Sequence, residues 1–294
     1  MIETIAVVGT GDMGHAVGRS LIENGYRVVT TLTDRSQHSR DLAAKVGIED
    51  LKSLEAVASE ADLLLSIVPP AVATSVATDM VAAMASVGRT LIYVDCNAIA
   101  PETASAIGLL VEEGGATFID AGIIGLAPGK DMTRFYVSGD DTSSMKALDG
   151  CGFRVITMSG GGCQGSAIKM CYAALTKGTW TLQLALLLAA EKLGVREILP
   201  DEFANSQAND LFRMEQRLPF IPADARRWVG EMEEIAKCFK GVGVPDRFHK
   251  GAAEIFRVLA QTPFAKETRD NIDKKRTLND VIPVYSEYLD GIQK

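Results

Sequence analysis

The sequence lacks the marks of several large classes of protein. Its 30 basic residues are outnumbered by 38 acidic ones, and a formal charge of -8 argues against a nucleic-acid-binding surface. Its five cysteines form no CxxC pair, so neither a disulfide framework nor a metal site is expected. The most apolar stretch, Leu182–Ala190, has about half of the residues that a bilayer-spanning helix needs, which predicts a buried helix and no membrane partner.

The composition predicts a packed protein. Hydrophobic residues make up 47% of the chain and charged residues 23%, which excludes disorder, and 294 residues suit two domains. No basic or apolar leader precedes the first strand-like run at Ile5–Val8, so we expect a cytoplasmic protein.

The first half of the chain alternates short β-branched runs with Ala-rich helical stretches. This alternation is typical of a Rossmann-type α/β domain with a mainly parallel sheet covered on both faces. The expected helices include 15–24, 71–85 and 101–113. The expected strands are 5–9, 27–32, 63–68, 91–95, 117–121, 134–138 and 153–157.

The pattern changes at a glycine-rich segment, residues 159–165. A long helical pattern follows over Ser166–Leu193, and the rest of the chain reads as further helices separated by turns. We therefore predict a dinucleotide-binding domain over residues 1–160 and an all-α substrate-binding and dimerisation domain over residues 161–294, opened by one long interdomain helix.

A glycine-rich motif follows the first strand and opens the first helix. Gly9 permits a tight turn, Gly11 lets the backbone approach a pyrophosphate, and Gly14 lets the helix pack on the strand. This context predicts a dinucleotide site rather than an ordinary turn. The six residues of the motif are Gly9, Thr10, Gly11, Asp12, Met13 and Gly14.

The loop after the second strand bears on the choice between NAD and NADP. A carboxylate here binds the ribose 2′-hydroxyl, whereas an arginine accommodates a 2′-phosphate. The strand tip is Leu32 rather than an acid, and Asp34 lies in the loop. Arg35, Ser36 and Arg40 could surround a phosphate, so we favour NADP over NAD, although Arg40 could equally start the next helix.

Two further loops follow buried strands and are expected near the nicotinamide. Val68, Pro69 and Pro70 close the third main strand, where the prolines serve equally well to end it. Asn97 follows the fourth strand, where its amide could bind nicotinamide or substrate or could cap the next helix.

Four ordered motifs together resemble the β-hydroxyacid dehydrogenase family, which includes 3-hydroxyisobutyrate and 6-phosphogluconate dehydrogenases. They are GTGDMG at 9–14, DCNAIAP at 95–101, DAGIIG at 120–125 and GCQGSAIK at 162–169. The resemblance spans the chain and points to a divergent branch with a C-terminal domain of unknown function. It implies an NAD(P)-dependent oxidoreductase that interconverts a hydroxy compound and its carbonyl.

The resemblance also implies roles for individual residues. Lys169 matches the family's catalytic lysine, the general acid and base. Four places depart from the family pattern: Ile124 replaces a serine, Ala173 replaces an asparagine, Asn97-Ala98 stands where the family has Ser-Thr, and Gly230-Glu231 stands where it has Lys-Asp. Because Ala173 removes the usual partner of the lysine, we expect Asn97 or the substrate itself to orient it. The expected substrate loop is Gly122, Ile123, Ile124 and Gly125.

The C-terminal half offers two more substrate-binding candidates, Glu231 and His249, although for His249 a half-buried structural histidine is the favoured interpretation. The apolar helix at 166–193 is expected to form the core of a homodimer. Two other functions remain open: an imine reductase-like enzyme and a non-catalytic NADP-binding or redox-sensing protein. The substrate itself cannot be transferred from any family member.

Overall fold

The computed structural model describes residues 2–129, 132–268 and 271–289. The chain divides into two compact units, Met1–Tyr172 and Ala173–Lys294.

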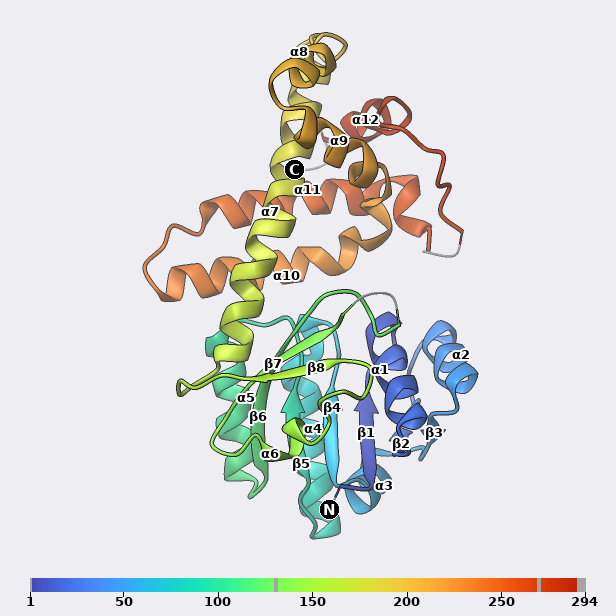
Figure 1. Cartoon of the computed structure of the whole chain (residues 1–294), viewed down its shortest axis with the longest axis vertical. Helices are drawn as coiled ribbons and strands as arrows, with labels where there is room; N and C mark the ends of the chain where they lie inside the picture. The colour runs from blue at the N-terminus through green and yellow to red at the C-terminus, as the bar shows by residue number, and fades with distance from the viewer. Residues whose placement is uncertain (1, 130–131, 269–270, 290–294) are drawn as a thin grey trace. The chain divides into compact units, whose positions relative to one another are not determined.

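The first unit is built on an eight-stranded sheet in the order β3-β2-β1-β4-β5-β6-β7-β8 (Figure 1). Neighbouring strands are parallel except β6 and β7, which are antiparallel. The strand order reverses between β1 and β4, and sheets of this kind bind ligands beyond the carboxyl ends of their strands at such a point. The strands are β1 (Thr4–Val8), β2 (Arg27–Thr30), β3 (Glu49–Asp50), β4 (Leu63–Ser66), β5 (Ile92–Asp95), β6 (Thr117–Ile124), β7 (Arg134–Ser138) and β8 (Arg154–Thr157).

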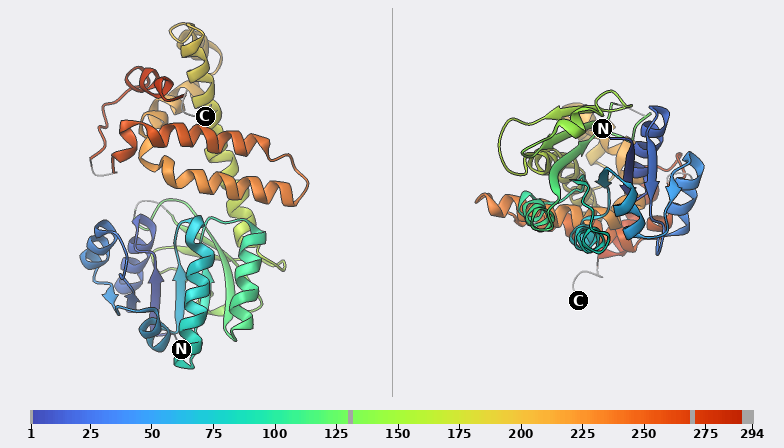
Figure 2. Two further views of the ribbon diagram at one scale, coloured as in Figure 1. Left: turned by 180° about the vertical axis from the view of Figure 1, so that it is seen from behind. Right: turned by 90° about the horizontal axis from the view of Figure 1, so that it is seen from below.

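Helices cover both faces of this sheet (Figure 2). Alternate residues of β1 enter two different cores, with Ile5 and Val7 packed in the same cluster as Val17 of α1, and Ala6 and Val8 in the other. This two-sided burial explains why the strands are apolar throughout rather than alternating. The helices are α1 (Asp12–Glu23), α2 (Gln37–Val46), α3 (Leu54–Glu60), α4 (Pro70–Val87), α5 (Pro101–Glu113), α6 (Ser143–Lys146) and α7 (Gln164–Lys192), whose first turns belong to this unit.

The second unit is helical. Helices α10 and α11 lie side by side (Figures 1 and 2), and Trp228, Met232, Phe256 and Leu259 are buried on them. The remainder of α7 contributes Leu184 to the buried residues. The elements of this unit are α8 (Leu199–Ser206), α9 (Ala208–Arg217), η1 (Leu218–Phe220), α10 (Pro222–Gly241), α11 (Arg247–Gln261), η2 (Pro263–Lys266) and α12 (Leu278–Glu287).

The predicted fold class, a mainly parallel Rossmann-type sheet followed by helices, is confirmed. All seven predicted strands are present, whereas the two-residue β3 escaped the sequence analysis because so short a strand carries no periodicity. The compact units meet inside α7, after Tyr172, whereas the sequence predicts a boundary at residue 160. The difference arises because the first turns of α7 bond to the sheet.

Helix α4 is the one helix, within the part of the chain that the structure describes, with the length and mean hydropathy of a membrane span. Its Ala73, Ala77 and Met80 are buried in the same core as residues of β1 and β4. A core helix passes the same test, so this single helix is weak evidence for a membrane.

Candidate active site

The loop between β1 and α1 has the geometry of a dinucleotide turn. Gly9 adopts φ +97°, and a Cβ there would lie 2.2 Å from the Ile67 carbonyl oxygen. A Cβ on Gly14 would lie 2.0 Å from the Gly9 carbonyl oxygen, whereas one on Gly11 would meet no atom within 4 Å. Gly9 therefore makes the turn, Gly14 lets the helix pack on the strand, and Gly11 leaves open space in which a ligand can approach the protein backbone.

The first turn of α1 faces this open space without a side-chain cap of its own. Gly11 is the N-cap residue and provides no side-chain hydrogen bond, while Asp12 and Met13 begin the helix. Amides at a helix N-terminus that lack a cap form an anion site, as a pyrophosphate requires. Thr10 donates its hydroxyl hydrogen to the Ser39 carbonyl oxygen at 3.0 Å, which ties the turn to α2.

A cavity of about 440 Å³ lies at the ends of β2 and β3. Its polar side is the loop after β2, with Thr33, Asp34 and Arg35, and its apolar side includes Val72 and Val76 of α4. Ligand pockets commonly have this size and mix of an apolar wall with a few polar groups. The cavity thus brings the predicted residues Asp34 and Arg35 together on one wall.

Lys52 also lines this cavity, although the sequence analysis did not single it out. Asp50 holds it there by accepting from the Lys52 amide at 3.0 Å and from Nζ at 2.7 Å, and the same carboxylate accepts from the Leu32 amide. Only the pairing of β3 with β2 brings Lys52 beside the predicted loop. A basic residue just beyond an acidic strand tip is the signal that could have found it.

The other residues of the loop after β2 have structural roles as well. Ser36 is the N-cap of α2 and accepts from the Ser39 amide at 3.2 Å. Arg40 lies within α2, and its Nε donates to the Arg35 carbonyl oxygen at 3.1 Å. Asp34 adopts φ 58°, in the left-handed region. Of the three predicted phosphate ligands, Ser36 and Arg40 thus use their side chains to stabilise the protein itself, which leaves Arg35 as the main candidate.

Asn97 joins the carboxyl ends of β4 and β5 and is only 2% exposed. Its Oδ1 accepts from the Val68 amide at 2.7 Å, and its Nδ2 donates to Ser66 Oγ at 3.1 Å and to Asp95 Oδ2 at 2.8 Å. Both amide hydrogens are therefore used inside the fold. The nearby Pro69 and Pro70 are the N-cap and first residue of α4.

Asp95 is fully buried beside Asn97, and burial raises its pKa to about 7, with the neighbouring Asp120 acting in the same direction. Hydrogen bonds from the Asn97 amide and side chain oppose this rise. Because the pKa of an aspartate in the unfolded chain is about 4, the folded state holds a proton that the unfolded state releases.

We expect the free energy of unfolding to fall as the pH rises from about 4 to about 7, because the contribution of Asp95 is present below its unfolded pKa and lost through its folded pKa. Urea denaturation across this range should show a shallower pH dependence for Asp95→Asn than for the unsubstituted protein. Parallel curves for the two proteins would show that Asp95 does not bind the extra proton.

Lys169 is half-buried in α7, and its Nζ donates to the Ile123 carbonyl oxygen at 2.7 Å. The prediction that Asn97 orients Lys169 is therefore wrong, because a backbone carbonyl holds the amine and Asn97 is used elsewhere. Ile123 and Ile124 are buried in β6, so Ile123 contributes its carbonyl rather than its side chain. The carboxyl end of β6 shares its edge of the sheet with those of β1, β4 and β5.

The predicted substrate-binding residues 122–125 form the end of β6 and the residue after it, and two of them are glycines. A Cβ on Gly122 would lie 2.0 Å from the Gly165 carbonyl oxygen and 3.0 Å from Lys169 Cβ, so α7 crosses β6 in direct backbone contact. Gly125 adopts φ +113°, in the region that favours glycine. The sequence motifs at 120–125 and 162–169 thus meet at one crossing point.

Two predicted substrate ligands lie in the second unit. Glu231 is 4% exposed, and its carboxylate pairs with Lys177 Nζ at 2.8 Å and with Arg227 at 3.0 Å. His249 is buried between the rings of Phe239 and Phe248, and burial lowers its pKa. Glu231 is therefore held in an internal ion pair, and His249 is favoured in its neutral form.

In the described ranges of the chain, no group of three His, Cys, Asp or Glu side chains has the arrangement of a metal site. The five cysteines are free thiols.

The fold and the glycine turn define the first unit as an NAD(P)-binding domain of the Rossmann type. The family described as the NAD binding domain of 6-phosphogluconate dehydrogenase matches residues 4–150, and a domain of unknown function, DUF1932, matches residues 190–259. The chain belongs to this family, within the β-hydroxyacid dehydrogenases, as its four motifs predict.

Individual relatives agree with this assignment. An uncharacterised 28.5 kDa protein of Methanothermus fervidus is 26% identical over 79% of this chain and 89% of its own length. The mitochondrial 3-hydroxyisobutyrate dehydrogenase of Drosophila melanogaster is 29% identical over 58% of this chain, and the match spans 52% of that relative. The 3-hydroxyisobutyrate dehydrogenase of Mycobacterium tuberculosis shares the fold over both whole chains, with 22% identity and a TM-score of 0.67.

Proposed function

We propose that this protein is a cytoplasmic, NADP-dependent oxidoreductase that interconverts a β-hydroxy acid or related alcohol and its carbonyl compound. Lys169 would act as the general acid and base. The observation that carries this proposal is the Lys169 amine, held at 2.7 Å on the Ile123 carbonyl, at the sheet edge that also carries the glycine turn. A proton-transfer group and a dinucleotide turn on one edge are what hydride-transfer chemistry requires.

The chain's own residues would divide the work as follows. The α1 N-terminus and Gly11 would bind the pyrophosphate, and Arg35 with Lys52 would bind the adenosine end. The cofactor, when bound, supplies or accepts the hydride. Lys169 would donate a proton to the carbonyl oxygen during reduction and take the hydroxyl proton during oxidation. The Ile123 carbonyl accepts from Lys169 Nζ at 2.7 Å and would thereby orient the amine.

The substrate would be less polar than those of the family members named above. Ile124 and Ala173 are apolar where the family has a serine and an asparagine, and both are buried here. Without these polar groups the protein would bind a carboxylate less strongly, since an unpaired charge is costly to desolvate. Hydroxy compounds with a larger apolar part are therefore the preferred class.

A turnover assay tests this function. Purified protein with NADPH should reduce at least one member of a panel of aldehydes, ketones and keto acids. The reaction is measured as the loss of NADPH absorbance. Turnover of cyclic imines alone would favour an imine reductase. Tight NADPH binding with no turnover across the panel would favour the non-catalytic, redox-sensing alternative.

We also propose that the protein is a homodimer built on α7. Within the second unit this helix leaves Leu175 at 76% and Leu182 at 55% exposure, and Leu193, directly after its C-terminal end, is 76% exposed. An apolar stripe of this kind is normally covered by a partner, and a two-fold axis offers the same helix of a second copy. Light scattering at micromolar concentration should give the mass of two chains, and Leu182→Glu should lower it to one. A monomeric unsubstituted protein would contradict this proposal.

A further inference from the structure

The N-terminal end of α7 is held by side chains of the sheet. Asp120 of β6 accepts from the Ser166 amide at 2.9 Å through Oδ2, and the Ser166 hydroxyl donates to Asp120 Oδ1. Ser138 of β7 donates to Asp120 Oδ2 at 3.0 Å and accepts from the Gly165 amide at 3.1 Å. Two amides of the first turn of α7 are therefore capped by residues from two strands.

These capping residues are placed to control one side chain. Ser166 precedes Lys169 by a single turn, and all three capping side chains are buried. The Gly122–Gly165 crossing sets how closely α7 approaches β6, whereas the hydrogen bonds set its rotation about its own axis. Rotation of the first turn would carry Lys169 Nζ away from the Ile123 carbonyl.

We infer that Asp120, Ser138 and Ser166 are positioning residues that fix the rotation of α7 and thereby the place of the Lys169 amine. This inference rests on the proposed role of Lys169. Asp120 makes its contacts to α7 and β7 rather than to the reacting atoms, so it would act only through Lys169. Its negative charge at the start of a helix also stabilises that first turn.

A double-mutant cycle with Lys169 tests this inference. Asp120→Asn keeps the shape but weakens the charge-assisted bonds, so kcat should fall roughly 10- to 100-fold with the KM for NADPH unchanged. In a Lys169→Ala background the same substitution should change kcat by less than about 2-fold, because the group it positions is gone. An equal loss of kcat in both backgrounds would overturn the inference, since it would show a general structural role.

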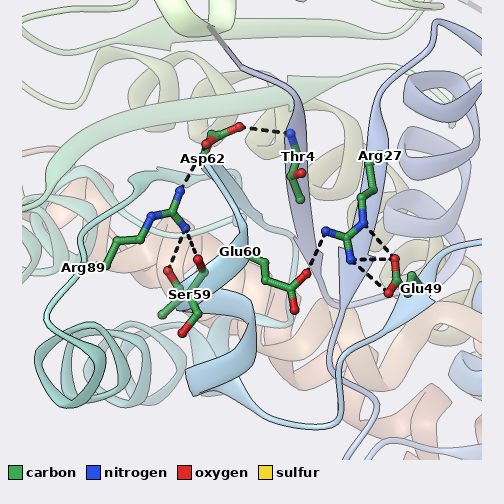
Figure 3. A network of polar contacts seen from close by, with 8 residues as sticks. Thr4, Arg27, Glu49, Ser59, Glu60, Asp62 and Arg89 are labelled. Atoms are coloured by element: carbon green, nitrogen blue, oxygen red, sulfur yellow. Dashed lines mark hydrogen bonds and ion pairs between the residues drawn. The ribbon is translucent and has the colours of Figure 1, made fainter.

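Asp62→Asn is a matched control, because Asp62 lies directly before β4 and contacts Thr4 and Arg89 (Figure 3). Asp62 likewise accepts from two backbone amides, those of Glu3 at 2.9 Å and Thr4 at 3.1 Å, and it pairs with Arg89. Its loss should lower stability but leave kcat within about 2-fold. A loss of kcat as large as that of Asp120→Asn would contradict a specific effect on Lys169.

Two variants keep the test decisive if Asp120→Asn does not fold. Ser166→Ala removes one hydroxyl bond and retains the amide bond to Asp120, and it should show the same dependence on Lys169. Gly122→Ala should displace α7 and lower kcat. Its control is Gly108→Ala, where the added Cβ would lie 2.8 Å from the Phe118 ring between α5 and β6. This control should lower stability and leave kcat unchanged. If Lys169→Ala alone keeps near-normal turnover, the proposed function itself is refuted. If Lys169→Ala is inactive but Ser166→Ala turns over normally, only the positioning role is refuted.

Discussion

Lys169→Ala is expected to lower turnover by roughly 10²- to 10⁴-fold, the range typical of a lost general acid or base. NADPH affinity should stay nearly unchanged, because the glycine turn and the cavity beside Arg35 involve other strands than β6. Lys169→Arg should fail almost as badly, since a guanidinium cannot release its proton near neutral pH. Steady-state kinetics and direct NADPH titration separate the two effects.

Lys146→Ala is the matched control for this prediction. Lys146 is another lysine of the first unit, on α6, with its Nζ 3.0 Å from Asp149 and 3.4 Å from the Val155 carbonyl oxygen. Its removal should leave kcat unchanged. Near-normal turnover of Lys169→Ala would contradict the assigned role and make His249 the next candidate for proton transfer.

Arg35→Ala should weaken NADPH binding about 10- to 100-fold and NADH binding little, because a charge-assisted bond to a 2′-phosphate is worth about 1.5–3 kcal/mol. Lys52→Ala should act in the same direction but less, since the Lys52 amine is already paired with Asp50 at 2.7 Å and would share its hydrogens. Fluorescence titration of both cofactors against both variants measures the selectivity. Cofactor binding by Arg40→Ala provides a comparison, because Arg40 lies in α2 and its Nε donates to the Arg35 carbonyl oxygen, which lies before that helix.

Asp34 supplies the outcome that would reverse this prediction. Its carboxylate lines the same cavity and would bind a free ribose 2′-hydroxyl but repel a phosphate. Equal weakening of both cofactors by Arg35→Ala, or tighter NADH binding by the unsubstituted protein, would show that Asp34 dominates and that NAD is the cofactor.

Much of the first unit could be predicted because its signals are local. The roles of Gly9, Gly11 and Gly14 follow from a turn that a few consecutive residues define, and the structure places them as expected. The continuous apolar strands of this unit directly predict a sheet that is buried on both faces. The two-residue strand β3 leaves no such signal in the sequence, and neither does the Asp50–Lys52 pair that follows from it beside the cavity.

The partner of Lys169 could not be predicted in the same way. Every residue has a backbone carbonyl, so the identity of residue 123 as isoleucine does not indicate that its carbonyl oxygen accepts from an amine 46 positions away. Asn97 is the better candidate on chemistry alone, but its acceptor oxygen Oδ1 already accepts from the Val68 amide, while Nδ2 donates to Ser66 and Asp95. Such competition for polar groups appears only when the strands are assembled.

The sequence by itself therefore determined the fold class and the dinucleotide turn, because each depends on residues close together in the chain, and Lys169 is a prediction from the resemblance of its motif. Tertiary structure decided which groups surround that lysine. Asp120 sits inside a strand and caps a helix 46 residues later, and Glu231 pairs with Lys177 from another helix. Hydrogen bonds and ion pairs between distant segments depend on packing geometry, which periodicity and motif spacing do not encode.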